Sequence, residues 1–480
     1  MRSVALIFLL VISAVGLIPS VAQASGLFVA RFGGEHGHAT TDNPTAIYYN
    51  PAGLALGNGT QLLIDATLAY RTASFTRPES SLSRFKDGEQ EGQRTGGTPE
   101  EALGANVGEA TLANEAAAPF IGVRSDFGIP NFGVGLGFFV PIGGAARWDG
   151  NDAFKDSAEH PGAQDGIARW WAMEGSMTAM YLALGAAYRL PDLGLSLGLS
   201  LNGVRTKVHT IRARNGDGTD DLIIPEKGSV KEGRTELEAS GNDLAIGVGV
   251  IYEPAEDMWV GVSYQTRPGI TGEQTLEGEL RQALATAPLN TSKIELVQGL
   301  ADILRVAYRQ RFGGKWEVRA QGELAFWSGM QRQCILDATV DSRSCETEDN
   351  GRTPQEFGFI ANLERQWEDA FGGRIGVSRY VNDRLELFGG AGYDASAIPD
   401  TFIDPALFDL DKYTVSLGAL YSLSDSLDLS GTFTQVIYME NDTSGSHKPP
   451  SMAPSSNGPD AGGVYKQAIS VLNISMLAKF

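Results

Sequence analysis

The sequence contains few of the residues on which metal and nucleotide chemistry depends. Only 2 of its 480 residues are cysteine and 5 are histidine, which excludes a disulfide-dense scaffold and a cysteine-rich zinc or iron–sulfur site. Basic residues are outnumbered, with 38 Lys and Arg against 58 Asp and Glu and a formal net charge of −20. Since phosphate binding requires a basic surface, no nucleic-acid partner is expected. We also expect no cofactor and no metal.

Long apolar runs are missing beyond the start of the chain, so no helix is expected to cross a membrane. The start differs, because Met1-Arg2-Ser3 precede an apolar run from Val4 to Ile18 and a small-residue end at Ala22-Gln23-Ala24. This order is typical of a secretory signal peptide cleaved after Ala24. A retained membrane anchor is the alternative, although the run is short for one. We therefore predict a signal peptide at residues 1–24 and an exported protein.

The two cysteines lie close together in a polar part of the chain. Cys334 and Cys345 are separated by ten residues, and exported proteins form disulfides. We predict that the two residues bridge a surface loop, with two free thiols as the alternative.

The hydrophobic pattern from residue 60 onward has a period of two. In residues 193–202, for example, five leucines alternate with glycine, serine and asparagine. Such alternation gives a strand one apolar and one polar face. A soluble sandwich alternates in the same way, but long strands, aromatic residues near strand ends and alternating long and short connections favour a membrane barrel.

Fourteen candidate strands account for this pattern. They span residues 60–77, 117–127, 131–142, 170–190, 193–211, 238–253, 257–268, 302–312, 315–328, 367–381, 384–394, 411–423, 426–438 and 464–480. Short turns on one side and long loops on the other are typical of a bacterial outer-membrane barrel. We predict an all-β fold: a 14-stranded antiparallel transmembrane β-barrel over residues 60–480.

Such a barrel is too wide for its own side chains to fill. Fourteen strands about 4.8 Å apart and tilted by about 40° enclose a bore of roughly 28 Å. Residues 25–59 lack the alternation but contain Phe28, Tyr48 and Leu54, whose apolar surface would be unfavourable in water. We predict that this segment is an N-terminal hatch plugging the lumen; a disordered periplasmic tail is the alternative.

The hatch segment also carries a recognisable motif. Asn50-Pro51-Ala52-Gly53, directly after Tyr48-Tyr49, resembles the hatch motif of the FadL/TodX family, and the likeness continues through residues 132–143, 304–327 and 389–400. Members of this family transport long-chain fatty acids and aromatic hydrocarbons across the outer membrane. The resemblance implies passive transport of a hydrophobic ligand by a protein that is not an enzyme. We expect a monomer surrounded by outer-membrane lipid and lipopolysaccharide, although the sequence does not determine the oligomeric state.

The resemblance further implies capture at the outer loops, passage past the hatch and lateral exit through a kinked third strand. In loop 269–301, Leu276, Leu280 and Leu284 recur at helical spacing. The resulting apolar stripe would either catch a lipid or pack on the barrel rim.

The third strand contains residues that weaken strand pairing. Gly135, Gly137, Pro141 and Gly143 fall within it, and glycine and proline both disturb a ladder. We predict a lateral opening there. Close packing of the glycines against the hatch is the alternative.

Charged residues fall on the polar face of several strands. An ion-pair ladder that anchors the hatch is the favoured role, and an arginine that receives a fatty carboxylate is the alternative. The inward-facing set is Asp65, Arg71, Arg305, Arg309, Glu317, Arg319 and Glu323. The predicted ligand-binding residues are Phe28, Tyr48, Leu54, Leu280, Leu284, Arg305 and Arg319.

Two other functions compete with transport. Gly194-Leu-Ser-Leu-Gly198 matches a hydrolase nucleophile pattern, but it lies within an alternating strand and lacks the required turn into a helix. A lipid hydrolase would also need a histidine beside it at one rim, whereas His160, His209 and His447 are scattered. A structural or adhesion barrel with surface-binding loops is the second alternative.

Overall fold

The computed structural model describes residues 31–82, 98–224, 227–270, 272–284, 287–345, 358–445 and 458–480. The predicted signal peptide, the first residues of the predicted hatch and Phe28 lie outside the described residues. None of the helices within the described ranges is long and apolar enough to cross a membrane.

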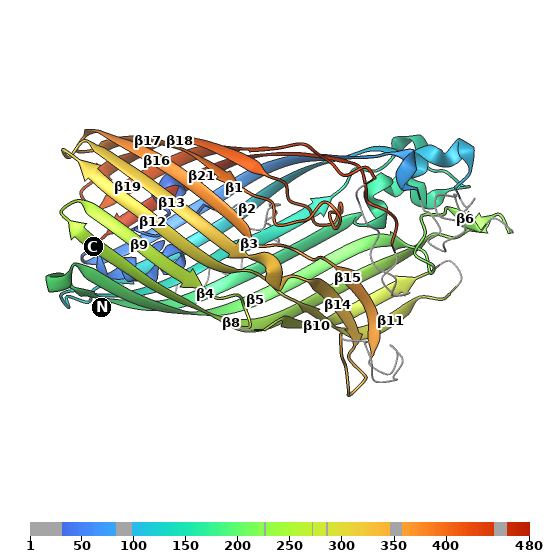
Figure 1. The fold of residues 1–480 in the computed structure, drawn as a ribbon, viewed down its shortest axis with the longest axis horizontal. Helices are drawn as coiled ribbons and strands as arrows, with labels where there is room; N and C mark the ends of the chain where they lie inside the picture. The colour runs from blue at the N-terminus through green and yellow to red at the C-terminus, as the bar shows by residue number, and fades with distance from the viewer. Residues whose placement is uncertain are drawn as a thin grey trace.

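Fourteen antiparallel strands form a closed barrel, which confirms the predicted fold class (Figure 1). The ring closes because β1 pairs with β2 on one side and with the last strand, β21, on the other. In order around the barrel the strands are β1 (Thr60–Arg77), β2 (Gly108–Ser125), β3 (Phe132–Arg147), β4 (Glu174–Leu190), β5 (Leu195–Arg214), β8 (Gly233–Ala255), β9 (Met258–Gln265), β12 (Asp302–Phe312), β13 (Trp316–Phe326), β16 (Ala370–Asn382), β17 (Leu385–Asp394), β18 (Lys412–Ser424), β19 (Leu427–Tyr438) and β21 (Val464–Lys479).

Apolar side chains cover the outside of this barrel and polar side chains face its interior. On β5, Leu199 is 56% exposed, whereas the neighbouring Ser200 and Asn202 are almost fully buried. This arrangement is the reverse of a soluble protein, and it is stable when lipid surrounds the barrel. The alternation read from the sequence therefore corresponds to lipid-facing and lumen-facing positions.

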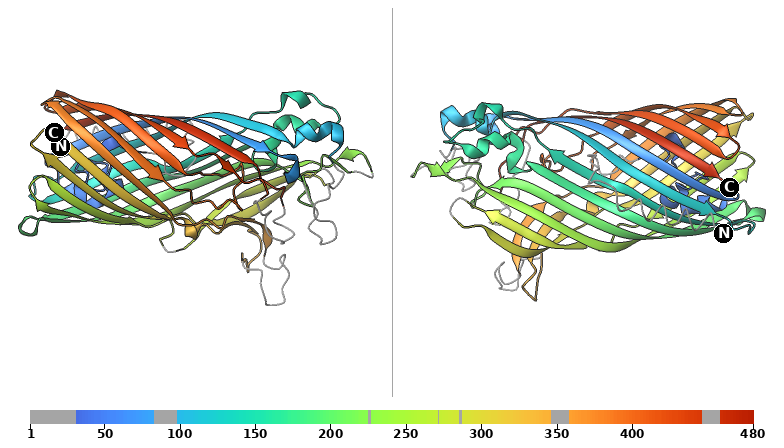
Figure 2. Two further views of the ribbon diagram at one scale, coloured as in Figure 1. Left: turned by 45° about the horizontal axis from the view of Figure 1, so that its top comes forward. Right: turned by 180° about the vertical axis from the view of Figure 1, so that it is seen from behind.

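The wall branches at the end of the barrel opposite the C-terminus (Figures 1 and 2). We call the barrel end that holds the C-terminus the lower end and the opposite end the upper end. Near the lower end β8 pairs with β9, whereas near the upper end it pairs with an additional strand, β10 (Gln274–Ala283). The sheet continues through β11 (Asn290–Gln298), β14 (Arg332–Asp337) and β15 (Phe359–Glu364). We call these four strands the side sheet. They occupy two segments that were expected to be loops.

The helical arrangement predicted for the leucines within residues 269–301 is wrong. Leu276 and Leu280 both lie on β10, and Leu284 follows the end of that strand. A spacing of four residues fits one face of a helix, but it also fits one face of a strand, because four is a multiple of two. Pairing with β8 and β11 decides in favour of the strand.

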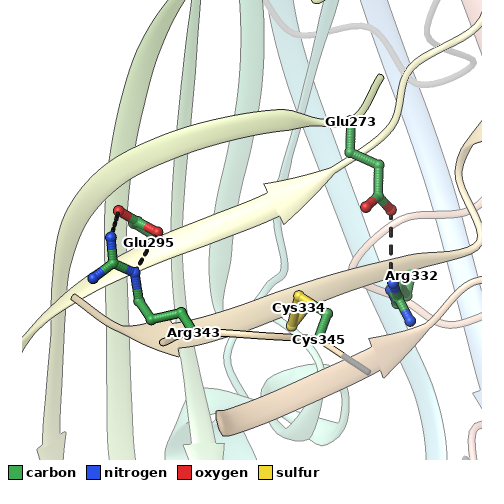
Figure 3. Close-up of a disulfide and its surroundings, with 6 residues drawn as sticks. All are labelled: Glu273, Glu295, Arg332, Cys334, Arg343 and Cys345. Carbon is green, nitrogen blue, oxygen red and sulfur yellow. Dashed lines mark hydrogen bonds and ion pairs between the residues drawn. A yellow bond between two sulfur atoms is a disulfide. The ribbon is translucent and has the colours of Figure 1, made fainter. Parts of the chain in front are cut away.

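A disulfide joins Cys334 of β14 to Cys345 in the segment that follows it. Two ion pairs flank the disulfide (Figure 3). Arg343 donates to both carboxylate oxygens of Glu295 on β11, at 2.8 and 2.7 Å. Arg332 lies 3.9 Å from Glu273. The first pair ties the cysteine-bridged segment to β11, and the second links β14 to the residue that precedes β10.

Residues 31–59 lie inside the barrel, at the end that holds the C-terminus, and we call them the hatch (Figure 1). They form the short helices η2 (Gly34–His36), α2 (Ala46–Tyr49) and η3 (Pro51–Ala55). Every residue of α2 and η3 is buried, so the apolar surface of Tyr48 and Leu54 is removed from water.

Candidate functional site

The hatch motif is seated on two neighbouring strands by the side chain of Asn50. Its amide nitrogen donates to the carbonyl oxygens of Ala39 at 2.8 Å, Val250 on β8 at 3.1 Å and Val262 on β9 at 3.3 Å. Its side-chain oxygen accepts from the Ala52 amide at 3.1 Å and so caps η3. One side chain thus fixes the hatch fold and its position on the wall.

Glycines on the barrel wall allow this close approach. A Cβ at Gly249 would lie 1.9 Å from the Asn50 side-chain oxygen, and one at Gly198 would lie 2.2 Å from the Ala52 nitrogen. On β3, a Cβ at Gly135 would meet the Leu54 side chain at 2.8 Å. The wall is therefore shaped for the hatch, because only glycine leaves room for its backbone and side chains.

Arginines on β12 hold the other side of the hatch. Arg305 donates to Glu323 at 2.7 Å and to the Tyr48 carbonyl at 3.3 Å, and its guanidinium lies 4.6 Å from the centre of the Tyr48 ring. Arg309 pairs with Asp42 of the hatch at 3.2 Å. Burial alone would raise the pKa of Asp42, but Arg309 and Arg311 outweigh it and lower that pKa. The hatch carboxylate therefore stays ionised and paired.

An aromatic cluster covers the upper side of the hatch. Phe32 lies 5.4 Å from both Tyr48 and Phe120, measured between ring centres. Phe139 of β3 stacks on Phe120 at 5.7 Å and on Tyr181 at 5.5 Å. The cluster contacts the hatch and the wall at the point where β2 and β3 last pair.

Above this point, in the described part of the chain, no ladder joins β2 to β3. Their pairing runs from Val134–Ser125 to Phe139–Phe120 and then ends, although both strands continue. Between Phe139 and Ile142 the register of β3 against β4 shifts by one residue, a β-bulge at Val140-Pro141. A bulge bends its strand and proline offers no amide hydrogen, so β3 turns away from β2. We call this unpaired interval the seam.

Hydrogen bonds cross the seam at two levels. Arg71 of β1 and Asn114 of β2 both donate to the carbonyl oxygen of Ala145, at 2.9 and 3.1 Å. Just beyond the end of β3, the Asp149 amide donates to the carbonyl oxygen of Thr111 at 2.8 Å, and the Thr111 hydroxyl donates to the Asp149 carboxylate at 2.7 Å. Side-chain hydrogen bonds thus hold the seam at Ala145 and at Asp149.

A cavity of about 1130 Å³, including its open side, lies between the seam and the side sheet. Gly144, Ala145 and Ala146 of β3 form the part of its wall next to the seam. Its apolar lining includes Met177, Val208, Leu237, Leu280, Leu296, Ile335, Leu407 and Phe408. Its charged lining residues are Arg71, Arg212, Arg214, Arg365 and Asp404. A mostly apolar cavity with a few charged groups suits a ligand with a long apolar body and a polar head.

The structure separates the predicted ligand-binding residues into different places. Leu280 lines the large cavity, and Tyr48 lines a second cavity of about 860 Å³ beside β13 and β16. Leu54, Arg305 and Arg319 lie in neither of these two cavities. Leu54 packs on the wall glycines, and Arg305 binds the hatch. Arg319 pairs with Glu317 at 3.2 Å.

The four residues predicted to form the lateral opening lie in two different parts of β3. Gly135 and Gly137 lie within the paired part of β3 and pack against Leu54 and Ile47 of the hatch, which was the alternative considered for these glycines. Pro141 and Gly143 lie at and above the bulge, beside the seam. The interruption in the wall therefore falls in the upper half of the strand.

Sequence reasoning missed most of the cavity wall. Residues 395–411 fold back into the barrel mouth, where Asp404 pairs with Arg365 at 2.6 Å and the Trp148 indole donates to the Pro405 carbonyl at 3.0 Å. The strand-like alternation of Leu276, Gly278 and Leu280 was the available signal for the side sheet. We find no local signal for Phe408 or Arg212 as cavity residues.

A closed barrel with a seated internal hatch, an apolar cavity and an interrupted wall defines a class of protein: an outer-membrane channel for hydrophobic compounds. The family comparison gives the same class. Residues 12–451 match the family described as outer membrane protein transport protein (OMPP1/FadL/TodX). The chain belongs to this family of transport channels and is located in the outer membrane. No curated protein matches it in sequence.

Solved structures share the fold at low sequence identity. A Pseudomonas aeruginosa FadL homologue superposes with a TM-score of 0.73 and 16% identity, covering 96% of this chain and 99% of that one. The Pseudomonas putida toluene transporter TodX has a TM-score of 0.60 and 13% identity, with the same coverage. The Ralstonia pickettii toluene transporter TbuX has a TM-score of 0.58 and 15% identity, again with 96% and 99% coverage.

Proposed function

We propose that this protein carries long-chain fatty acids, or amphiphiles of the same kind, passively across the outer membrane. The ligand enters the cavity beside the side sheet and leaves sideways through the seam between β2 and β3. The observation that carries the proposal is the continuity of these two features, because Gly144, Ala145 and Ala146 belong to both.

The lining of the cavity favours an acid over a plain hydrocarbon. Arg365 is already paired with Asp404 of the same cavity, but Arg71 and Arg212 would be costly to bury around an uncharged ligand, whereas a carboxylate accepts charge-assisted hydrogen bonds from them. The apolar part of the wall accommodates the acyl chain. Lateral exit suits such a ligand, since the chain passes from an apolar cavity into lipid without crossing water.

The hatch blocks the direct path along the barrel axis. Residues 31–59 occupy the bore and most of them are buried, so a solute that reaches the cavity meets the seam before it meets the periplasmic mouth. We propose that the predicted hatch, residues 25–59, remains a plug during this transfer and that Asn50, Pro51, Ala52 and Gly53 hold it in place.

Removal of the bulge tests lateral exit. Below the bulge, Phe139 pairs with Tyr181, and above it Ile142 pairs with Ala179, so deletion of Pro141 alone gives β3 a continuous register. The deletion straightens β3 and lets it pair with β2 across the seam. We expect uptake of radiolabelled oleate by a deletion strain expressing this variant to fall at least tenfold.

Pro141→Ala is the matched control, because it restores an amide hydrogen but keeps the extra residue that bends the strand. It should retain most of the uptake. Normal uptake by a folded Pro141 deletion would exclude the lateral route. Absence of any oleate uptake by the unmodified protein would instead favour the adhesion alternative.

A further inference from the structure

Arg71 and Asn114 hold the same backbone atom at the seam, but only one of them is charged. Arg71 donates from Nη1 to the Ala145 carbonyl oxygen at 2.9 Å, and Asn114 donates from its side-chain amide at 3.1 Å. Arg71 comes from β1 and Asn114 from β2, so the two side chains reach from one side of the seam to the β3 backbone on the other. They replace the ladder hydrogen bonds that β2 and β3 lack there.

The guanidinium of Arg71 has neutral partners in this position. The side chain is 2% exposed, and within the described part of the chain it forms no ion pair. Nε donates to Gln467 at 2.9 Å, and the guanidinium carbon lies 5.0 Å from the centre of the Phe408 ring. Nη2 makes no hydrogen bond to another described residue. Among the described residues no carboxylate lies within ion-pair distance of Arg71, and the Asp409 carboxylate acts on it only from farther away, so this buried cation is poorly compensated.

Arg71 also lines the cavity, together with Phe408 and Ala145. A carboxylate that arrives there with its chain along the apolar wall meets a guanidinium with one free nitrogen. A carboxylate accepts two parallel hydrogen bonds from one guanidinium and also carries the opposite charge, whereas the neutral Ala145 carbonyl accepts one bond and carries none. The carboxylate is therefore the better partner for both Nη1 and Nη2.

We propose that Arg71 is the receptor for the carboxylate of the ligand and that ligand binding there unlatches the seam. When the carboxylate takes Nη1, Ala145 loses its charged donor and, of the two side chains on its carbonyl, only Asn114 remains. The proposal rests on lateral exit. It adds that the ligand's own charge opens its exit, so a hydrophobic compound without an anionic head passes poorly.

Substitutions of the two residues that donate to the Ala145 carbonyl test whether the ligand's charge releases this contact. The alternative is that the contact only stabilises the wall. Arg71→Gln keeps a hydrogen-bond donor but cannot attract an anion, whereas Asn114→Ala removes the neutral donor and leaves the charge. The probes are oleate and its methyl ester, which differ at the head group. Uptake of each is measured in a deletion strain, and amide hydrogen exchange of residues 140–147 is measured on purified protein with each probe.

For the unmodified protein, we expect uptake of oleate to exceed uptake of the ester by about tenfold, the loss that accompanies one unmade charged hydrogen bond. Oleate should accelerate exchange in residues 140–147, and the ester should not. Asn114→Ala should raise uptake of both probes and keep their ratio. Arg71→Gln should bring the ratio to about one and abolish the exchange response to oleate. Amide exchange in β5 verifies that each variant is folded. If Arg71→Gln does not fold, Arg71→Lys is tested in its place.

Retention of the oleate preference and of the exchange response in folded Arg71→Gln would overturn the latch. Loss of the preference in Asn114→Ala would also overturn it, since that residue carries no charge. These outcomes are distinct from failure of lateral exit, which is tested by the Pro141 deletion: if that variant transports normally, the route is wrong, and if it is blocked while Arg71→Gln still prefers oleate, only the latch is wrong.

Discussion

Gly249 faces Asn50 so closely that a Cβ added to the glycine would lie 1.9 Å from the Asn50 side-chain oxygen. The two residues are separated by almost two hundred positions, yet the wall at Gly249 leaves room for the Asn50 side chain only because it has no Cβ there. This contact makes the seating of the hatch a property of the wall as much as of the hatch motif.

Gly249→Ala should unseat the hatch without opening the barrel wall. The added methyl group has no space, because its neighbours are the Asn50 side chain and Pro51, and overpacking of this kind costs about 1–3 kcal/mol. We expect a raised ion conductance in planar bilayers. Gly322→Ala is the matched control, since nothing lies within 4 Å of a Cβ at that strand position; equal conductance in the two variants would contradict the prediction.

Asn50→Ala should weaken the same seat from the hatch side. The substitution removes the donor to Ala39, Val250 and Val262 and leaves buried carbonyl groups with fewer partners, at a cost of about 1–3 kcal/mol. Oleate uptake should change while the barrel stays folded, and deletion of residues 45–55 should have the larger effect. Asn43→Ala is the control, because Asn43 caps only Thr45 within the hatch. Unchanged uptake in a folded Asn50→Ala variant would remove the hatch from the mechanism.

Acid should loosen the hatch through His38. Burial, with Arg309 and Arg319 nearby, holds the pKa of His38 well below its ordinary value of 6.5, and its Nδ1 accepts the Thr40 amide at 3.2 Å. An undocked hatch takes up a proton as the pH falls below about 6.5, whereas the docked hatch does not. Docking stability is therefore fully present above that pH and falls by up to about 1.4 kcal/mol per pH unit below it.

The measurement is bilayer conductance at pH 7.5 and pH 5.5. The unmodified protein should conduct more at the lower pH, and His38→Asn, which keeps a hydrogen-bond acceptor but does not titrate, should show a smaller difference. The same pH response in both proteins would assign the effect to another group.

Loss of the disulfide should affect ligand capture more than barrel stability. Cys334 and Cys345 are 11 positions apart, and a bridge that closes a loop of this size stabilises it by about 3 kcal/mol. In Cys334→Ser with Cys345→Ser, residues 332–345 should become sensitive to protease on intact cells and the half-saturating oleate concentration should rise. The barrel strands should keep their protection. If protease sensitivity is equal with and without the bridge, the disulfide has no role in holding the side sheet.

The sequence predicted the barrel closely because strand alternation is a local property. Each of the fourteen candidate segments contains one observed barrel strand or overlaps it, and the first was placed at residues 60–77, the observed limits of β1. Leu199 and its neighbours alternate regardless of which strand lies beside them. The hatch motif was also found locally, since Asn50 both caps its own short helix and binds the wall.

The side sheet and the cavity could not be predicted in this way. Leu276 and Leu280 fit a helix or a strand equally well, and only pairing with β8 and β11 distinguishes them. The charged lumen residues were correctly placed inside, but their roles differ: Arg305 holds the hatch, whereas Arg71 lines the cavity and crosses the seam.

By itself, the sequence determined that strands would form, which of their faces would meet lipid, and where most of them would begin and end, because backbone geometry links side-chain period to strand face within a few residues. Only the tertiary structure decided which strands pair along their full length, where the wall is interrupted and which arginines reach the cavity. Those outcomes depend on register between segments that lie up to hundreds of residues apart, such as Arg71 with Gln467, and no local pattern encodes that register.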